Sequence, residues 1–276
     1  MNDFFNMLII GIVQGLTEFL PVSSSGHLVI FGDLLGLKQN GIALEVFVHF
    51  GTLLAVCTCF YKDIIRLIKE LPRLHTHIAN KMPNDSEDEQ YRSMNIYILI
   101  SMIPAGIIGV FFKDYLEKFY HNLYLVFSCL MVTGFILLSL KWSKKRKKKP
   151  FMNAKDSLLI GIGQAIAILP GISRSGTTIS IAEALGIKSA LAAKFSFLMS
   201  IPVIAGITIL ELKDLVQQQV TQAELINYAI AMTSAAISGF FAIKFLMIII
   251  RKQRMEYFAY YCFLAAIVGL VLNLQK

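Results

Sequence analysis

The chain contains two copies of one motif in which an apolar stretch is broken by proline, serine and glycine. The first copy reads GIVQGLTEFLPVSSSGH over residues 11–27, and the second reads GIGQAIAILPGISRSGTT over residues 161–178. Gln14 of the first copy and Gln164 of the second are 150 residues apart, and a one-residue gap aligns the rest. Proline removes a backbone donor and glycine permits unusual dihedral angles. Each copy therefore predicts a hairpin of two short helices with a break between them.

The composition is typical of a polytopic, all-α membrane protein. Apolar residues make up 56% of the 276 residues, and the mean hydropathy is +0.64. Six segments are long enough to cross a bilayer as helices, namely residues 42–61, 93–112, 121–140, 189–210, 225–249 and 256–273. The helices of the two motifs are too short to cross. Because irregular backbone at membrane depth must be buried in protein or line a wet cavity, we expect both hairpins to be re-entrant.

The number of spans predicts how the two copies are related. With three spans in each half, the second half runs through the membrane in the opposite direction to the first. This is an inverted-topology repeat, in which the site lies where the broken helices meet near the midplane. We expect a single membrane domain over residues 1–276, with repeat one at about 1–141, a basic cytoplasmic loop at about 142–155 and repeat two at about 156–276.

The distribution of positive charge predicts the orientation. The loops on one side of this topology carry eighteen Lys and Arg residues, and the loops on the other side carry five. The richer set consists of residues 62–92, 141–155, 186–188 and 250–255. The positive-inside rule makes that side cytoplasmic and places both termini outside. The net charge of +8 is explained by these loops, so it does not indicate a nucleic-acid partner.

Some charged residues lie outside the motifs. Apolar and basic residues alternate over residues 62–73, a pattern typical of an amphipathic helix on a membrane surface. The alternative is that this segment and the basic run KKRKKK at residues 144–149 only determine the membrane topology or link helices. Five further polar residues near membrane depth are interpreted as supporting contacts, interface groups or ion pairs: Glu45, His49, Glu183, Lys194 and Lys244.

The first motif places an amide and a carboxylate on one helix face. Gln14 and Glu18 have the spacing i, i+4. A carboxylate in a membrane segment costs several kcal/mol, so it usually has a partner or a function. Its oxygens and the amide oxygen suit a hard cation such as Mg²⁺ or Ca²⁺. The alternative is that Glu18 neutralises Arg174 or caps a neighbouring helix.

The serine-rich turns predict anion binding. Hydroxyl groups cap the free N–H groups of a helix start, and the same N–H groups with the helix dipole attract anions. The first turn contributes Ser23, Ser24, Ser25 and Gly26, and the second contributes Ser173, Arg174, Ser175, Gly176, Thr177 and Thr178. Arginine adds a planar fork of donors that matches phosphate oxygens. A serine cap without ligand binding is the simpler alternative, but the arginine favours phosphate.

His27 follows the first turn and is suited to acid–base or nucleophilic chemistry. Considered alone, a histidine at this position is explained equally well as a structural residue and as a base. Together with Glu18 and Arg174 it predicts hydrolysis of a phosphate or diphosphate, because the cation and the guanidinium neutralise charge on the transferred phosphoryl group. A site within the membrane indicates that a lipid carries the phosphate.

The segments QGLTEFLPVSSSGH and LPGISRSGTTIS resemble the two signature motifs of the undecaprenyl-diphosphate phosphatases, the bacitracin-resistance family of bacterial inner membranes. The resemblance extends over the whole chain. It implies a metal-dependent enzyme that removes one phosphate from undecaprenyl diphosphate and so regenerates the lipid carrier for cell-wall synthesis. It also implies inverted repeats with two re-entrant hairpins.

The resemblance implies roles for single residues. Glu18 would handle the metal or the catalytic water, with Gln14 beside it, and Arg174 would bind phosphate. His27 or Ser24 would attack phosphorus, or His27 would activate the attacking group; we favour His27, with Ser24 in support. Some family members have Glu where this chain has Gln14, which makes Glu18 the one acidic residue of this motif.

Two other functions use similar features. A transporter or lipid flippase would also have inverted repeats and broken helices, but it would release no phosphate. A lipid phosphatase of another class would need separated basic, serine and histidine motifs, whose spacing is absent from this sequence. The oligomeric state is undecided by the sequence, and a homodimer remains an open alternative.

Overall fold

The computed structural model describes residues 2–37, 41–74, 87–112, 115, 119, 122–143, 148–149, 151–217 and 221–274, and these residues are almost entirely helical. The α-helices are α1 (Asn2–Phe19), α2 (Ser24–Leu34), α3 (Gly41–Cys59), α4 (Tyr61–Glu70), α6 (Glu87–Phe111), α8 (Leu123–Ser143), α9 (Ala154–Ile166), α10 (Arg174–Ala184), α11 (Ser189–Gln217), α12 (Gln222–Arg251) and α13 (Glu256–Leu274). A short 3-10 helix, η1 (Leu71–Arg73), extends α4. The prediction of an all-α protein is confirmed.

Several of these helices can cross a membrane. Within the described residues, α6, α8, α11, α12 and α13 are long and apolar enough to span, and α3 with α4 makes a sixth candidate if the bent pair is counted as one. The bend between them is 84°. The predicted span at residues 42–61 is thus helix α3, which ends at Cys59. The chain is a multi-pass membrane protein.

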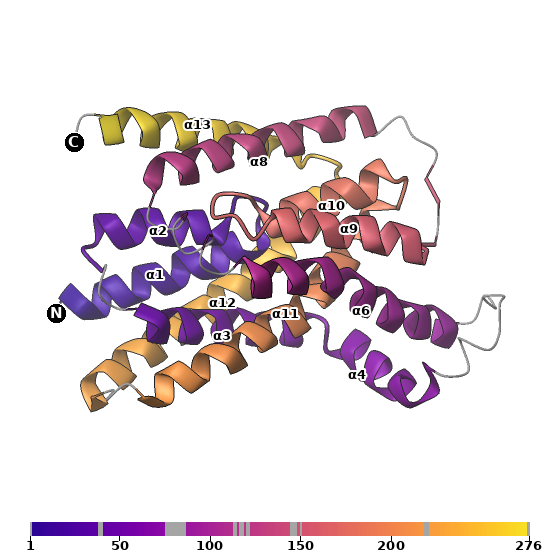
Figure 1. Cartoon of the computed structure of the whole chain (residues 1–276), viewed down its shortest axis with the longest axis horizontal. Coiled ribbons are helices and arrows are strands. Elements are labelled where there is room, and N and C mark those ends of the chain that lie inside the picture. The colour runs from indigo at the N-terminus through magenta and orange to yellow at the C-terminus, as the bar shows by residue number, and fades with distance from the viewer. Residues whose placement is uncertain are drawn as a thin grey trace.

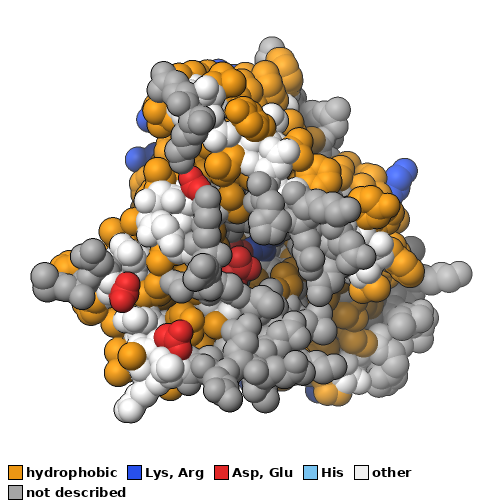
Figure 2. Space-filling view, turned by 60° about the vertical axis from the view of Figure 1, so that its left-hand side comes forward, with side chains coloured by type: hydrophobic (Ala, Val, Ile, Leu, Met, Phe, Trp, Pro, Cys, Tyr) orange, Lys and Arg blue, Asp and Glu red, His pale blue; other side chains and the backbone are white. Residues whose placement is uncertain are grey.

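The surface fits an apolar surrounding. Figure 2 shows hydrophobic side chains over much of the described surface on one face, with few charged groups among them. Val110 is 75% exposed, Leu264 65% and Phe135 62%. Soluble monomers rarely expose contiguous apolar surface of this kind, so lipid tails are the natural surrounding of these side chains.

The two motif segments form the expected hairpins of short helices. α1 ends just before Leu20-Pro21, and α9 ends shortly before Leu169-Pro170. In Figure 1 the α1–α2 hairpin enters from the end of the bundle where both termini lie, and the α9–α10 hairpin enters from the opposite end. Their turns meet in the middle of the bundle, so the segments that carry the predicted site are brought together.

Matching glycines let each hairpin pack closely against a long helix. A Cβ at Gly11 of α1 would lie 1.9 Å from Ser234 Oγ of α12. A Cβ at Gly161 of α9, the matching position, would lie 2.5 Å from the Ser101 carbonyl oxygen of α6. Small residues permit this close approach of backbones in membrane proteins. The first helix of each hairpin is therefore fixed against a helix of the other half.

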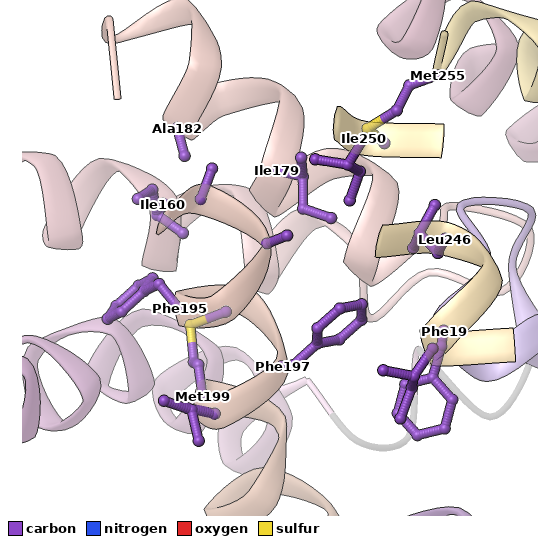
Figure 3. Packing of buried hydrophobic residues seen from close by; sticks show 14 of the residues in the cluster. Phe19, Ile160, Ile179, Ala182, Phe195, Phe197, Met199, Leu246, Ile250 and Met255 are labelled. Atoms are coloured by element: carbon purple, nitrogen blue, oxygen red, sulfur yellow. The ribbon is translucent and has the colours of Figure 1, made fainter. Parts of the chain in front are cut away.

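The core holds the first motif in place. Phe19, directly after Glu18, is fully buried and makes an edge-to-face contact with Phe197 of α11, with ring centroids 5.8 Å apart. Phe195 and Phe197 are also buried in the same cluster (Figure 3). This packing fixes the end of α1, and with it the position of the neighbouring carboxylate.

Candidate active site

Each serine turn caps its own helix in the same way. Ser23 Oγ accepts a hydrogen bond from Gly26 N–H at 3.3 Å, and Ser173 Oγ accepts one from Gly176 N–H at 3.1 Å. Within each turn, two serine hydroxyls two positions apart lie 3.3 Å from each other: Ser23 with Ser25, and Ser173 with Ser175. The predicted capping is confirmed in both turns, although Ser23 has φ +70° and Ser173 is extended.

The two turns are also bonded to each other. Gly171 N–H donates to Ser23 Oγ at 3.2 Å, and Ser175 Oγ donates to the Leu20 carbonyl oxygen at 3.3 Å. Gly171 has φ +97°, and a Cβ there would lie 2.3 Å from the Val126 carbonyl oxygen, so only glycine fits. The turns of the two hairpins thus form one compact unit.

Helix α8 supports this unit from the side. Thr133 Oγ1 donates to the Gly171 carbonyl oxygen at 2.8 Å and accepts from Ser173 N–H at 2.9 Å. Thr133 is fully buried. Thr133 was not identified from the sequence, because nothing in the local sequence distinguishes a threonine in an apolar helix as a supporting residue.

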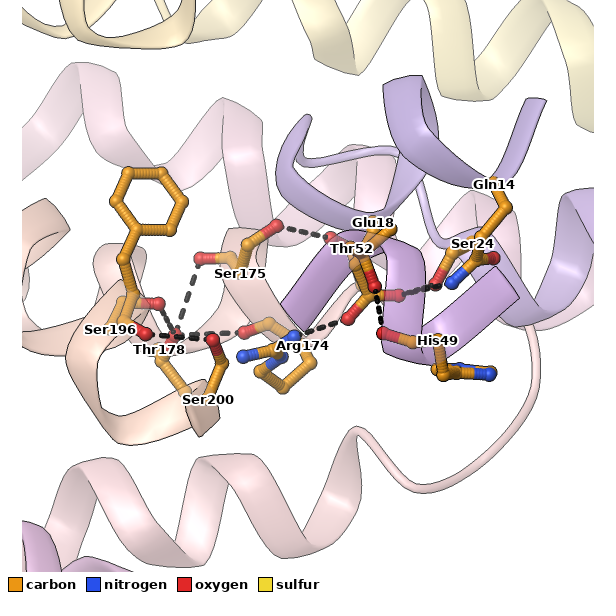
Figure 4. Close-up of polar contacts among 12 residues, drawn as sticks. Gln14, Glu18, Ser24, His49, Thr52, Arg174, Ser175, Thr178, Ser196 and Ser200 are labelled. Atoms are coloured by element: carbon orange, nitrogen blue, oxygen red, sulfur yellow. Dashed lines mark hydrogen bonds and ion pairs between the residues drawn. The ribbon is translucent and has the colours of Figure 1, made fainter. Parts of the chain in front are cut away.

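Glu18 is the centre of the polar cluster shown in Figure 4. Its Oε2 accepts from Ser24 Oγ at 2.6 Å and from Gln14 Nε2 at 3.1 Å, and its Oε1 forms an ion pair with Arg174. The Glu18 side chain is 6% exposed and the Arg174 side chain 16%. The structure thus brings together four of the predicted site residues from both motifs. This ion pair is also expected under the alternative stated above, in which Glu18 only neutralises Arg174.

Helix α3 contributes a second group of polar residues beside Glu18. His49 is close enough to Glu18 to interact with it electrostatically, and Figure 4 draws His49 and Thr52 of α3 in the same view as the carboxylate. Thr52 Oγ1 donates to the His49 carbonyl oxygen at 2.8 Å. Thr52 was missed in the sequence, whereas His49 was interpreted as a supporting residue.

His27 is turned toward helix α13. Its Nδ1 contacts the Ser23 carbonyl oxygen at 2.8 Å, and its Nε2 contacts Tyr261 Oη at 2.7 Å. Because a carbonyl only accepts, Nδ1 carries the proton and Nε2 accepts from the tyrosine hydroxyl. The rings of His27 and Tyr261 are stacked, with centroids 5.7 Å apart. Among the described contacts, His27 makes none with Glu18, Ser24 or Arg174. Tyr261 carried no signal in the sequence.

The remaining residues of the second turn anchor α10. Thr178 Oγ1 lies 2.7 Å from Ser196 Oγ of α11 and donates to the Arg174 carbonyl oxygen at 2.8 Å. Thr177 Oγ1 is buried and has no hydrogen-bond partner within the described part of the chain. Thr178 is therefore engaged in packing α10, whereas the Thr177 hydroxyl group is not engaged.

The residues present fit one kind of cation site. No group of three or more His, Cys, Asp or Glu side chains that could hold a metal occurs among the described residues. Gln14 Oε1, however, is buried without a hydrogen-bond partner beside the Glu18 carboxylate. Mg²⁺ typically binds one or two carboxylates and completes its shell with water and substrate phosphates. One carboxylate and one amide oxygen fit that mode, but not a cage built from protein ligands alone.

Comparison with known proteins adds the family. The family described as bacitracin resistance protein BacA matches residues 7–268 of this chain. The chain belongs to the BacA family. A relative from Halothermothrix orenii named undecaprenyl-diphosphatase is 40% identical over 98% of both chains. Proteins of the same name from Methanobrevibacter smithii and Carboxydothermus hydrogenoformans are 40% and 37% identical, and in each case at least 96% of both chains is covered. The BacA match includes both hairpins and therefore the whole polar cluster.

Proposed function

We propose that the chain is an integral membrane phosphatase that hydrolyses undecaprenyl diphosphate to undecaprenyl phosphate and inorganic phosphate. This reaction recycles the lipid carrier for cell-wall synthesis and accounts for the link to bacitracin resistance in the family description. The observation that carries the proposal is the largely buried cluster of Glu18, Ser24 and Arg174 at the meeting point of two helix starts. The names of the relatives agree with it.

The cluster explains how a diphosphate is bound. The N-termini of α2 and α10 meet at the turns, and helix starts attract anions. Arg174 forms an ion pair with Glu18, and a phosphate group offers the guanidinium a stronger, doubly charged partner. On binding, Arg174 moves from the carboxylate to the terminal phosphate and neutralises charge there during the reaction. The other residues of the two turns surround the phosphate: Ser23, Ser25, Ser173, Ser175, Gly176 and Thr177.

Hydrolysis adds water across one anhydride bond. The bond between the terminal phosphorus and the bridging oxygen breaks, and the bridging oxygen leaves with undecaprenyl phosphate. Ser24 is the favoured attacking group, because its hydroxyl already donates to Glu18 Oε2 at 2.6 Å and the carboxylate is placed to take its proton. Water then hydrolyses the phosphoserine. This revises our preference for His27, whose ring nitrogens are both engaged.

A divalent cation, Mg²⁺ or Ca²⁺, would be held by Glu18 and Gln14. Gln14 Oε1 is the buried acceptor without a partner, and release of Arg174 to the substrate frees Glu18 Oε1. When bound, the cation supplies positive charge that stabilises the transferred phosphoryl group. Of the two ions, Mg²⁺ suits a site with so few protein ligands.

The membrane arrangement belongs to the same proposal. The two hairpins are re-entrant and the halves form an inverted repeat, supported by their opposite entry, the matched capping bonds and the matched glycines. Both termini lie at one end of the bundle, and α4 with the start of α9 lies at the other (Figure 1). Because the basic segments belong to the α4 end, we place that end in the cytoplasm. An outward opening of the site is a further part of this proposal.

Phosphate release tests the function directly. Purified protein in detergent is given undecaprenyl or farnesyl diphosphate, with and without Mg²⁺ or Ca²⁺. We expect metal-dependent release that Glu18→Ala and Arg174→Ala both abolish, and a weaker response to metal in Glu18→Gln. Exposed Arg254→Ala is the matched control and should retain activity. No release from folded protein, with translocation of labelled lipid in vesicles, would instead establish a flippase.

A further inference from the structure

Helix α4 leaves the bundle sideways. It begins at Tyr61, directly after α3, and the two helices are bent by 84°. Figure 1 shows α4 at the end of the bundle opposite the termini. If α3 crosses the membrane, a helix bent from it by nearly a right angle runs along the membrane surface.

The acidic residues of α4 face the protein. Asp63 Oδ1 accepts from Tyr91 Oη and from Lys194 Nζ, each at 2.6 Å. Glu70 is 4% exposed and forms an ion pair with Arg92 at 2.8 Å. Of the roles left open for Lys194 by the sequence, the structure shows the ion pair. Both negative charges of α4 are neutralised on its inner side.

The inner side is also fixed by apolar and backbone contacts. Leu67 is buried, and its carbonyl oxygen accepts from Asn95 Nδ2 of α6 at 2.9 Å. Four separate side chains of α6 and α11 thus bind α4. Its orientation is set by the protein, so the outer side is a fixed feature and not a result of free rotation.

The outer side carries apolar and basic residues only. Tyr61, Ile65 and Ile68 are 54%, 48% and 58% exposed, and their spacing places them on one helix face. Lys62 and Lys69 are exposed beside this face. Arg66 and Arg73 are exposed as well, although Arg66 stacks on Tyr91 and Arg73 pairs with Glu70.

We propose that the outer side of α4 binds the anionic phospholipid headgroups of the leaflet at its end of the bundle. Ile65 and Ile68 insert among the acyl chains, and Lys62 and Lys69 contact lipid phosphates. An apolar face flanked by basic residues is the pattern of interfacial helices that bind anionic lipid. Charge complementarity selects this occupant, because every carboxylate of α4 points away from it. The inference is independent of the proposed phosphatase activity.

Fluorescence quenching in vesicles tests this contact. Trp142 is the single tryptophan, so Trp142→Phe with Ile68→Trp gives the full chain one indole on the outer side of α4. The protein is placed in vesicles of phosphatidylcholine and phosphatidylglycerol in which one lipid is brominated. Each basic residue near a membrane surface contributes about 1 kcal/mol, or roughly fivefold in relative binding. We expect phosphatidylglycerol to quench several-fold more effectively than its mole fraction predicts.

Neutralising the two lysines should remove this preference. Lys62→Gln with Lys69→Gln should bring the relative quenching by the two lipids close to equal. Lys188→Gln with Lys252→Gln removes two other exposed lysines from loops outside α4 and should leave the preference unchanged. Equal quenching in the starting protein would overturn the proposal. Absence of quenching by either lipid would also overturn it, because the outer side of α4 would then not contact lipid.

Discussion

Removal of Arg174 should destabilise the protein as well as inactivate it, and the two effects can be separated. The Glu18 side chain is 6% exposed and has Arg174 as its ion-pair partner, with hydrogen bonds from Ser24 and Gln14. Breaking a buried ion pair by removing one partner costs about 3–5 kcal/mol, because the remaining charge is left uncompensated. Arg174→Ala should lower the thermal unfolding midpoint in detergent by about 6–20 °C.

A second substitution distinguishes this electrostatic cost from lost packing. Glu18→Gln removes the charge that Arg174 neutralises, so the Glu18→Gln/Arg174→Ala double variant should regain most of the stability lost in Arg174→Ala. Its phosphate release should stay reduced, because an arginine that stabilises a transferred phosphoryl group contributes about 10³-fold or more.

The assay is the unfolding midpoint in one detergent of the starting protein, Arg174→Ala, Glu18→Gln and the double variant, together with phosphate release from undecaprenyl diphosphate. Arg254→Ala, an exposed arginine, controls for the loss of a guanidinium and should change neither quantity. A midpoint of Arg174→Ala within about 2 °C of the starting protein would refute the reasoning, since that is less than 1 kcal/mol. A double variant as unstable as Arg174→Ala would refute it as well.

Three further predictions concern packing, the histidine and topology. Gly161→Ala should lower the free energy of unfolding by about 1–3 kcal/mol, because its Cβ meets the α6 backbone. Gly109→Ala is the control and should be tolerated, because a Cβ there has no neighbour within 4 Å. Equal unfolding midpoints of the two variants would contradict this prediction. Tyr261→Phe should leave the pH profile of phosphate release unchanged and destabilise by about 1 kcal/mol or less, because Glu18 and not His27 takes the proton of Ser24; an altered profile would return the histidine to the mechanism. In a cysteine-free background, Lys188→Cys and Gln222→Cys should react with an impermeant thiol reagent from opposite membrane faces; labelling from one face would reject the inverted repeat.

Local chemistry made the hairpins predictable. Proline and glycine break helices and serine caps them wherever they occur, so both breaks and both caps follow from the sequence. The contact of Gln14 with Glu18 follows from the i, i+4 spacing. We predicted the meeting of the two turns by treating the second copy of the motif as inverted relative to the first.

Contacts between distant helices were not predictable in the same way. Tyr261 bonds to a histidine far away in the chain, and it lies in an aromatic-rich apolar stretch where nothing distinguishes it. No proline or glycine lies at the bend after Cys59 to indicate a break in the helix. The bend coincides with the start of the charged residues of α4. Such features depend on which helices pack together, which one sequence does not specify.

The pairing of Glu18 with Arg174 also has a consequence for how the protein is made. The two residues are separated by 156 positions, which corresponds to roughly 8–30 s of translation at about 5–20 residues per second. During that interval the carboxylate has entered the membrane without its cation, and it has to stay hydrated or protonated because a bare charge in hydrocarbon is costly. The nascent first half cannot complete its polar cluster. Completion of the second hairpin is therefore the step at which the newly synthesised chain becomes both electrically balanced and chemically competent.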